Sequence, residues 1–377
     1  MAFEHYKQVA GKRLRCGYTT GTCAALAAAG AVRLLLTGRA PETVSLCTPG
    51  GLTVEAALLV QGQGPDWAAC GVVKDGGDDV DATDGALICA RVRRMGRPGV
   101  QILGGPGVGR VTRPGLDQPV GQAAINRVPR QMLEQQVLSV CDQMGCEEGM
   151  EVTVYVPQGE ALAEKTFNPR LGIEGGISIL GTSGIVEPMS IQAIVETTAL
   201  ELRQAAAAGA RQVVLTPGNY GLDFWEEHGI NDMAPIVKCS NFIGEALDEA
   251  AALGFSEVLL VGHVGKLVKL AGGVMNTHSR WADCRMELFC AHAAVCGGDS
   301  GVCRALMDAA TTDGCIAILD QAGLRQKVLA SLLEAVQRHL TCRVAGACRV
   351  GALLFSNEYG LLGMTSGAEE MMRRWKE

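Results

Sequence analysis

The segment from residue 171 to about residue 275 repeats one pattern four times: a short apolar run, a loop of small residues and a stretch with helical spacing. Short strands that alternate with helices are typical of a parallel sheet, because parallel neighbours need a crossover connection between them. The four apolar runs are residues 177–180, 213–215, 236–238 and 258–261. The pattern therefore predicts a Rossmann-like parallel α/β domain over residues 171–280.

The loops that follow the four runs predict a binding site. Ligands of parallel sheets bind outside the carboxyl ends of the strands, so we expect loops 181–184, 216–221, 239–241 and 262–266 to form one mouth. Small residues in such loops favour a small molecule held largely by backbone N–H groups. The candidate binding residues are Gly181, Thr182, Ser183, Gly184, Gly218, Asn219, Tyr220, Ser240, Asn241 and Gly262. His263, which ends the fourth strand, is the histidine best placed for a site.

These loops match neither of the common phosphate-binding fingerprints. Gly-x-Gly-x-x-Gly does not occur in the chain, and Gly265-Lys266 is followed by Leu267 instead of Ser or Thr. The alternative interpretation is that the glycines form tight structural turns. The pattern predicts a ligand site without identifying the ligand.

The two flanking segments differ from this regular pattern. Residues 1–170 predict a mixed α+β domain with strands at 44–47, 52–60, 67–73, 86–92, 100–103 and 152–156 and helices at 24–36 and 130–143. Residues 281–377 predict a helical segment that packs on the preceding domains and contains one strand, 350–355. The sequence leaves open which sheet this strand joins.

An acidic loop at residues 74–85 carries five aspartates within ten residues. Clustered carboxylates are ligands for hard cations, but the spacing does not match the calcium-binding helix–loop–helix pattern. A carboxylate here can instead bind ribose hydroxyls or an ammonium, or act as a base, for which Asp78 is our candidate. A solvated acidic loop is the remaining interpretation.

Residues 91–130 form a basic window in a chain whose formal net charge is −7. The window holds one acid, Asp117, and eight arginines, at positions 91, 93, 94, 97, 110, 113, 127 and 130. Arginine suits bidentate recognition of carboxylate or phosphate, and Arg110 and Arg113 lie within a glycine-rich stretch. A solvated basic face is the alternative. We expect no nucleic-acid partner, because the chain is acidic overall and the window has no aromatic residues for stacking.

The cysteine pattern indicates a reduced, cytoplasmic protein. The fifteen cysteines are scattered and form no Cys-x-x-Cys pair, so they predict neither a disulfide framework nor a zinc site. Residues 1–15 lack the apolar core of a signal peptide. The alanine-rich stretch 23–36 is shorter than a membrane span and contains Arg33.

Several segments together closely resemble the CbiD family, cobalt-precorrin-5B C1-methyltransferases of anaerobic cobalamin biosynthesis. The segments are LRCGYTTGTCAA (14–25), residues 73–85 and 107–116, NPRLGI (168–173), GGISILGTSGIVEPMS (175–190), TPGNYG (216–221), VKCSNFIGEA (237–246) and GHVGKLVKLAGGVMNTHSR (262–280). The resemblance extends from about residue 12 to the end of the chain.

The resemblance implies S-adenosylmethionine as methyl donor and a cobalt-precorrin tetrapyrrole as acceptor, methylated at C1 to give cobalt-precorrin-6A. Cobalt then belongs to the substrate, and the protein needs no metal of its own. The acceptor carries many acetate and propionate carboxylates, which suit an arginine-rich face. The candidate residues for substrate binding are Tyr18, Thr19, Thr20, Arg110, Arg113 and Arg170.

Methyl transfer from a sulfonium is an in-line displacement that depends mainly on holding the reactants close and aligned. A base is either unnecessary or removes a proton after methylation, and His263 and Asp78 are the candidates. Two alternatives are a non-catalytic tetrapyrrole carrier and a magnesium-dependent phosphate-transferring enzyme. The sequence leaves open whether the chain forms a homo-oligomer and whether another pathway enzyme hands over the substrate.

Overall fold

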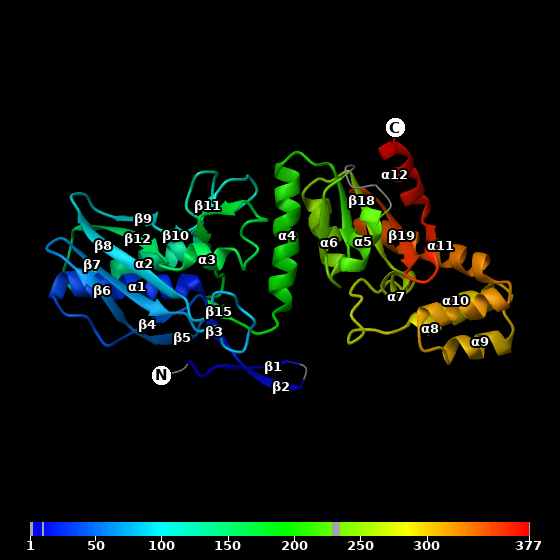
Figure 1. The fold of residues 1–377 in the computed structure, drawn as a ribbon, viewed down its shortest axis with the longest axis horizontal. Coiled ribbons are helices and arrows are strands. Elements are labelled where there is room, and N and C mark those ends of the chain that lie inside the picture. Colours follow the sequence, from blue (N-terminus) through cyan, green and yellow to red (C-terminus); the bar gives the residue numbers. More distant parts are fainter. Residues whose placement is uncertain (1–2, 10, 228–233, 377) are drawn as a thin grey trace. The chain divides into compact units, whose positions relative to one another are not determined.

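The computed structural model describes residues 3–9, 11–227 and 234–376. The chain divides into two compact units, Met1–Ser190 and Ile191–Glu377 (Figure 1). The division lies twenty residues beyond the expected boundary between residues 170 and 171, because residues 171–190 form short strands that pair within the first unit. Each unit is mixed α/β, and the second contains the parallel sheet.

The first unit contains a five-stranded sheet. Its strands, in spatial order, are β6 (Leu59–Gln63), β7 (Trp67–Val73), β8 (Leu87–Met95), β12 (Gly149–Tyr155) and β9 (Val100–Gly104). Only the β12–β9 pair is parallel. The predicted strand 52–60 is two strands, because β5 (Thr53–Ala57) pairs with β4 (Thr43–Cys47), whereas β6 pairs with β7.

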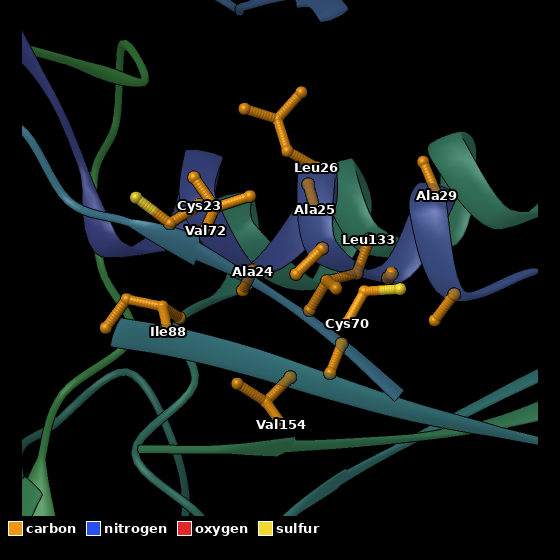
Figure 2. Packing of buried hydrophobic residues seen from close by; sticks show 14 of the residues in the cluster. Cys23, Ala24, Ala25, Leu26, Ala29, Cys70, Val72, Ile88, Leu133 and Val154 are labelled. Atoms are coloured by element: carbon orange, nitrogen blue, oxygen red, sulfur yellow. The ribbon is translucent and has the colours of Figure 1, made fainter. Parts of the chain in front are cut away.

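Two helices, α1 (Thr20–Thr37) and α2 (Arg127–Gln143), pack against each other and against this sheet. Figure 2 shows Ala24 of α1 facing the strands that carry Val72, Ile88 and Val154. Alanines on α1 let the helix approach the sheet closely, and most of them are fully buried. By length and composition α1 could cross a membrane, but 78% of it is buried, as in the core helix of a soluble protein.

Short strand pairs tie residues 171–190 into the first unit. The pairs are β10 (Gly107–Val108) with β14 (Gly176–Ile177), β11 (Arg110–Val111) with β13 (Ile173–Glu174), and β3 (Gly17–Tyr18) with β15 (Ile185–Val186). A β-hairpin of β1 (Tyr6–Val9) and β2 (Lys12–Arg15), and the short helix α3 (Gly159–Ala163), complete the unit. Backbones meet at Gly107, which has φ +72°, and a Cβ there would lie 1.9 Å from the carbonyl oxygen of Val156.

The second unit is built on a sheet with four parallel strands and one antiparallel edge strand. In spatial order these are β17 (Ile236–Lys238), β16 (Gln212–Thr216), β18 (Glu257–His263), β19 (Arg349–Ser356) and β20 (Gly360–Met364). The predicted strands at 213–215, 236–238, 258–261 and 350–355 are confirmed. The prediction that run 177–180 is a strand of this sheet was wrong, because Ile177 pairs with Val108 in the first unit.

Helices cover both faces of the parallel sheet. They are α4 (Ile191–Ala207), α5 (Asn219–Glu227), α6 (Ile243–Ala252), α7 (Val264–Leu267), α8 (Arg285–Val295), α9 (Ser300–Met307), α10 (Thr312–Gln321), α11 (Arg325–Val344) and α12 (Ser366–Lys376), with the 3-10 turn η1 (Val268–Gly272). Val258 and Leu260 of β18 belong to one hydrophobic core, and Leu259 and Val261 belong to the other. A strand buried on both faces reads as a continuous apolar run, which is why the sequence pattern identified it.

Glu257 anchors the C-terminal helix to the sheet. Its carboxylate is 2% exposed and accepts hydrogen bonds from Trp375 and Arg374 of α12 and from Arg349 of β19. Burial alone would raise the pKa of Glu257, but these donors outweigh burial and hold the pKa below its usual value. The C-terminal segment is therefore joined to the parallel sheet by β-pairing and by ion pairs and hydrogen bonds to one buried carboxylate.

We expect Glu257→Gln to lower the free energy of unfolding by about 1–3 kcal/mol at pH 7, because hydrogen bonds to a charged acceptor are lost. A carboxyl group with a depressed pKa stabilises the fold above its unfolded pKa of about 4.3 and loses this effect as the pH falls through the folded pKa. The difference between wild type and variant should therefore shrink below about pH 4. Urea denaturation at both pH values measures it.

Glu370→Gln is the matched control, because Glu370 also pairs with Arg374 but its side chain is 59% exposed. We expect this control to change the unfolding free energy by less than about 0.5 kcal/mol. An equal loss in the two variants would contradict the role of Glu257.

Candidate functional site

The carboxyl ends of β16, β17 and β18 form one edge of the parallel sheet in the second unit. From β16 the chain adds β17 on one side and β18 on the other. This reversal of direction is a topological switch point, where crossover connections leave a crevice for a ligand. The loops after β16 and β18 flank that crevice.

Close backbone contacts shape the switch point. A Cβ on Gly262 would lie 3.0 Å from Cγ of Pro217, so the end of β18 and the loop after β16 meet there. The ammonium of Lys266 donates a hydrogen bond to the carbonyl of Pro217 and links the same two loops. Thr216 is fully buried, and its hydroxyl has no hydrogen-bond partner among the described residues. The switch point is thus closely packed, and it contains a buried hydroxyl that lacks a hydrogen-bond partner within the described residues.

The loop after β17 lies at the same edge. Ser240 has φ +53°, a left-handed conformation that is strained for a residue other than glycine. Asn241 accepts a hydrogen bond from the Thr277 hydroxyl at 3.2 Å, and Lys238 donates one to Asn219 at 2.9 Å. The structure thus places six candidate residues at one sheet edge, in the loops after β16 and β17, at the start of α5 and at the end of β18: Gly218, Asn219, Tyr220, Ser240, Asn241 and Gly262.

The loop of Gly181, Thr182, Ser183 and Gly184 belongs to the first unit instead. A Cβ on Gly181 would lie 2.4 Å from the Thr19 hydroxyl, and one on Gly184 would lie 2.8 Å from Cβ of Thr48. Both glycines have positive φ angles, +132° and +80°. The prediction that this loop follows a strand of the parallel sheet was wrong, because its glycines pack at the start of α1.

Threonines at the start of α1 hold this loop. Thr19 caps the helix by accepting from the N–H of Thr22. The Thr20 hydroxyl donates to the Ser178 carbonyl at 3.1 Å and accepts from the N–H of Leu180 at 3.0 Å. Tyr18 is also buried and donates to the Val73 carbonyl. These hydroxyls are buried and bonded within the protein, so they position the surrounding loops.

Three candidate arginines lie on or near one strand pair of the first unit. Arg110 is on β11, and Arg113 follows it, with its side chain packed against Gly172, the residue before β13. Arg170 precedes the same turn, and all three side chains are exposed. Two other arginines of the basic window, Arg93 and Arg94 of β8, pair with Glu151 and Glu148. The three arginines at the β11–β13 edge form no such ion pair with the described residues, so this edge keeps its positive charge.

The acidic loop forms internal contacts. Asp75 pairs with Arg15, Asp81 pairs with buried Lys74, and Asp84 accepts from the N–H of Gly76. Asp78 accepts from the N–H of Arg15 at 2.7 Å. The hydrogen bonds from Arg15 hold the pKa of Asp75 below its usual range. Within the described residues, no group of three or more potential metal ligands is present.

His263 ends β18 and caps α7. Its Nδ1 accepts a hydrogen bond from the N–H of Gly265 at 3.0 Å, so the neutral ring carries its proton on Nε2. Burial lowers the pKa of His263, although the carboxylate of Asp313 raises it. A histidine whose free lone pair already accepts a backbone N–H is better suited to positioning a loop than to accepting a proton.

A cavity of about 360 Å³ lies beside this edge. It is lined by Asn241, Gly265, Lys266, Lys269, Thr277, His278, Ser279, Asp283 and Arg285. Its charged residues are spread over twenty positions of the sequence, from Lys266 to Arg285, and converge only in the fold. The local sequence feature that indicates this cavity is the pair of lysines at positions 266 and 269, three positions apart.

Residues 7–188 match the CbiD family, and residues 276–366 match the CbiD C-terminal domain. A protein of Ruminiclostridium cellulolyticum is 45% identical over 370 residues, covering 96% of each chain. One from Salmonella typhimurium is 40% identical over 373 residues, again covering 96% of each. This chain belongs to the CbiD family.

Both of these relatives are named cobalt-precorrin-5B C(1)-methyltransferase. A crystal structure of a cobalamin biosynthesis protein (CbiD) from Archaeoglobus fulgidus is 28% identical, covers 73% of this chain and 86% of that chain, and has a TM-score of 0.40. The resemblance stated from the sequence motifs is confirmed.

We expect Thr20→Val to lower the free energy of unfolding by about 1–3 kcal/mol, because the Ser178 carbonyl and the Leu180 N–H lose their shared partner. Thr37→Val is the control, since Thr37 is exposed and bonds only within its own turn and the residues after it. Its effect should stay below about 0.5 kcal/mol. Urea denaturation distinguishes the two, and indistinguishable curves would contradict the role of Thr20.

Proposed function

We infer that this chain is a methyltransferase that methylates C1 of cobalt-precorrin-5B, giving cobalt-precorrin-6A. Membership of the CbiD family carries this inference, because the match extends over nearly the whole chain of relatives with that name. It also favours this function over a tetrapyrrole carrier or a phosphate-transferring enzyme. All fifteen cysteines are free, which agrees with the reducing cytoplasm that we propose as its location.

The proposed donor is S-adenosylmethionine, bound at the switch point of a Rossmann-like sheet in the second unit. Gly218 leaves space beside the backbone, since only the Lys266 ammonium lies within 4 Å of a Cβ built there, and the unsatisfied Thr216 hydroxyl lies at the end of β16. S-adenosylmethionine supplies an electrophilic methyl group on sulfur. The residues around it need to bind and orient it.

The proposed contact surface for the acceptor in the first unit is the β11–β13 edge. Arg110, Arg113 and Arg170 present exposed guanidinium groups that can each bind a carboxylate in two hydrogen bonds. Tyr18, Thr19 and Thr20 support this unit from inside through their buried hydroxyls. The bound cobalt is part of the acceptor.

In this proposal the protein accelerates methyl transfer mainly by positioning the two reactants. Holding the two reactants close and aligned lowers the activation free energy by about 7–11 kcal/mol, because their translational and rotational entropy is lost on binding and not in the reaction step. His263 orients the turn that carries Lys266, and Asp78 fixes strand β2 through the N–H of Arg15. Neither residue is required as a base before methyl transfer, since an electron-rich ring carbon attacks the methyl group without prior deprotonation and S-adenosylhomocysteine leaves.

Binding of S-adenosylhomocysteine tests the donor assignment. We expect saturable calorimetric binding, and in soaked crystals we expect density beside residues 216–219 and 262–266. A pure tetrapyrrole carrier gives no binding, and a phosphate-transferring enzyme binds Mg-ATP instead. Density remote from these loops would contradict the proposed site even if binding is observed.

Two substitutions test the roles of the candidate bases. We expect His263→Asn and Asp78→Asn to slow single-turnover methylation by less than about tenfold, because an asparagine oxygen still accepts the backbone N–H in each place. Loss of a general base costs roughly 10²–10⁴-fold. A loss of that size with unchanged thermal stability would assign proton transfer to the residue. His263→Ala, which removes the cap, should instead lower stability by about 1 kcal/mol.

A further inference from the structure

The cavity beside the sheet edge has an excess of positive charge. Lys266, Lys269 and Arg285 line it together with a single carboxylate, that of Asp283. Arg285 binds Asp283 through Nε and Nη2, at 2.6 and 2.8 Å. Lys269 is 2% exposed and lies 3.8 Å from the same carboxylate. The single carboxylate of Asp283 thus pairs with two of the three cations, Arg285 and Lys269.

The ammonium of Lys269 already has hydrogen-bond acceptors within the protein. Its ammonium donates to the carbonyls of Thr277 and Ala282, at 3.0 and 2.9 Å, and Asp283 lies near the third proton. These contacts hold the 277–283 segment over the cavity. Lys269 is therefore a structural cation that adds positive potential without offering a free donor.

Lys266 differs from Lys269 because it has no carboxylate partner within the described part of the chain. It is half-buried, and its only hydrogen bond there is the one to the Pro217 carbonyl. An ammonium carries three protons, so two remain for a ligand. Burial lowers the pKa of Lys266, and the charge of Lys269 lowers it further. A bound anion would relieve both effects.

We propose that this cavity binds a carboxylate group of one of the two reactants, with the Lys266 ammonium as its ion-pair partner. The proposal rests on the proposed function, in which both donor and acceptor carry carboxylates. The donor's amino-acid end is the favoured source, because Lys266 also contacts Pro217 at the switch point where the donor is proposed to bind. A propionate or acetate of the tetrapyrrole is the other source of the same group.

Binding of three probes to wild type and Lys266→Met tests the proposal. S-adenosylhomocysteine has the amino-acid carboxylate, 5′-methylthioadenosine lacks it, and cobyrinic acid carries the carboxylates of a corrin. We expect Lys266→Met to weaken S-adenosylhomocysteine about 10- to 100-fold, as for a lost charged hydrogen bond, and to leave 5′-methylthioadenosine unchanged. Lys266→Arg should recover most of the affinity.

Lys327→Met is the matched control, since Lys327 is an exposed lysine of the same unit that does not line the cavity. It should change no affinity. Thermal unfolding verifies that each variant is folded, and Lys266→Gln replaces the methionine variant if that one is not. Loss confined to cobyrinic acid would also support the carboxylate site and assign it to the acceptor.

Equal losses for S-adenosylhomocysteine and 5′-methylthioadenosine would overturn the proposal, because Lys266 would then act only by holding Pro217. Unchanged affinity for every probe would overturn it while leaving the proposed function intact. Failure of wild type to bind any of the three would overturn both.

Discussion

The pairing of β18 with β16 on one side and β19 on the other is the interaction on which the second unit depends. β18 is buried on both faces, and its hydrogen bonds bring residues 349–356 beside residues 257–263 although about ninety positions separate them. Its first residue, Glu257, binds the C-terminal helix, and its last, His263, begins the turn of the switch point. One strand therefore connects the stability of the unit to the geometry of the proposed site.

The first unit depends on small residues. Alanines bring α1 close to the sheet, and glycines allow backbones to meet where β10, β14 and α3 converge. Threonine hydroxyls at the start of α1 then hold the 178–184 loop. In this unit, the glycine-rich segments that suggested ligand-binding loops are mostly explained by close packing of one backbone segment against another. The exposed arginines at the β11–β13 edge are the feature of this unit that is available to bind an anionic partner.

Local charge matters more in this protein than its net charge of −7. Two of the five aspartates in the acidic loop pair with Arg15 and Lys74, and two arginines of β8 pair with Glu151 of β12 and with Glu148 just before it. Cations without such partners occur at the β11–β13 edge in one unit and at Lys266 in the other. Both places suit carboxylates, the groups shared by the two proposed reactants.

The sequence by itself determined the family, the strands and helices of the main layers, and three of the four loops at the edge of the parallel sheet. Apolar runs such as 258–261 and alanine-rich helices are recognisable from the sequence alone. Burial on one or two faces imposes a hydrophobic pattern on each element, whichever elements it packs against. Only the tertiary structure decided that Ile177 pairs with Val108, that β19 completes the parallel sheet, and that Lys266, Lys269, Asp283 and Arg285 share one cavity. The two strand pairings depend on partners far apart in the chain, and the cavity depends on how the segment after β18 folds back, neither of which hydrophobic periodicity encodes.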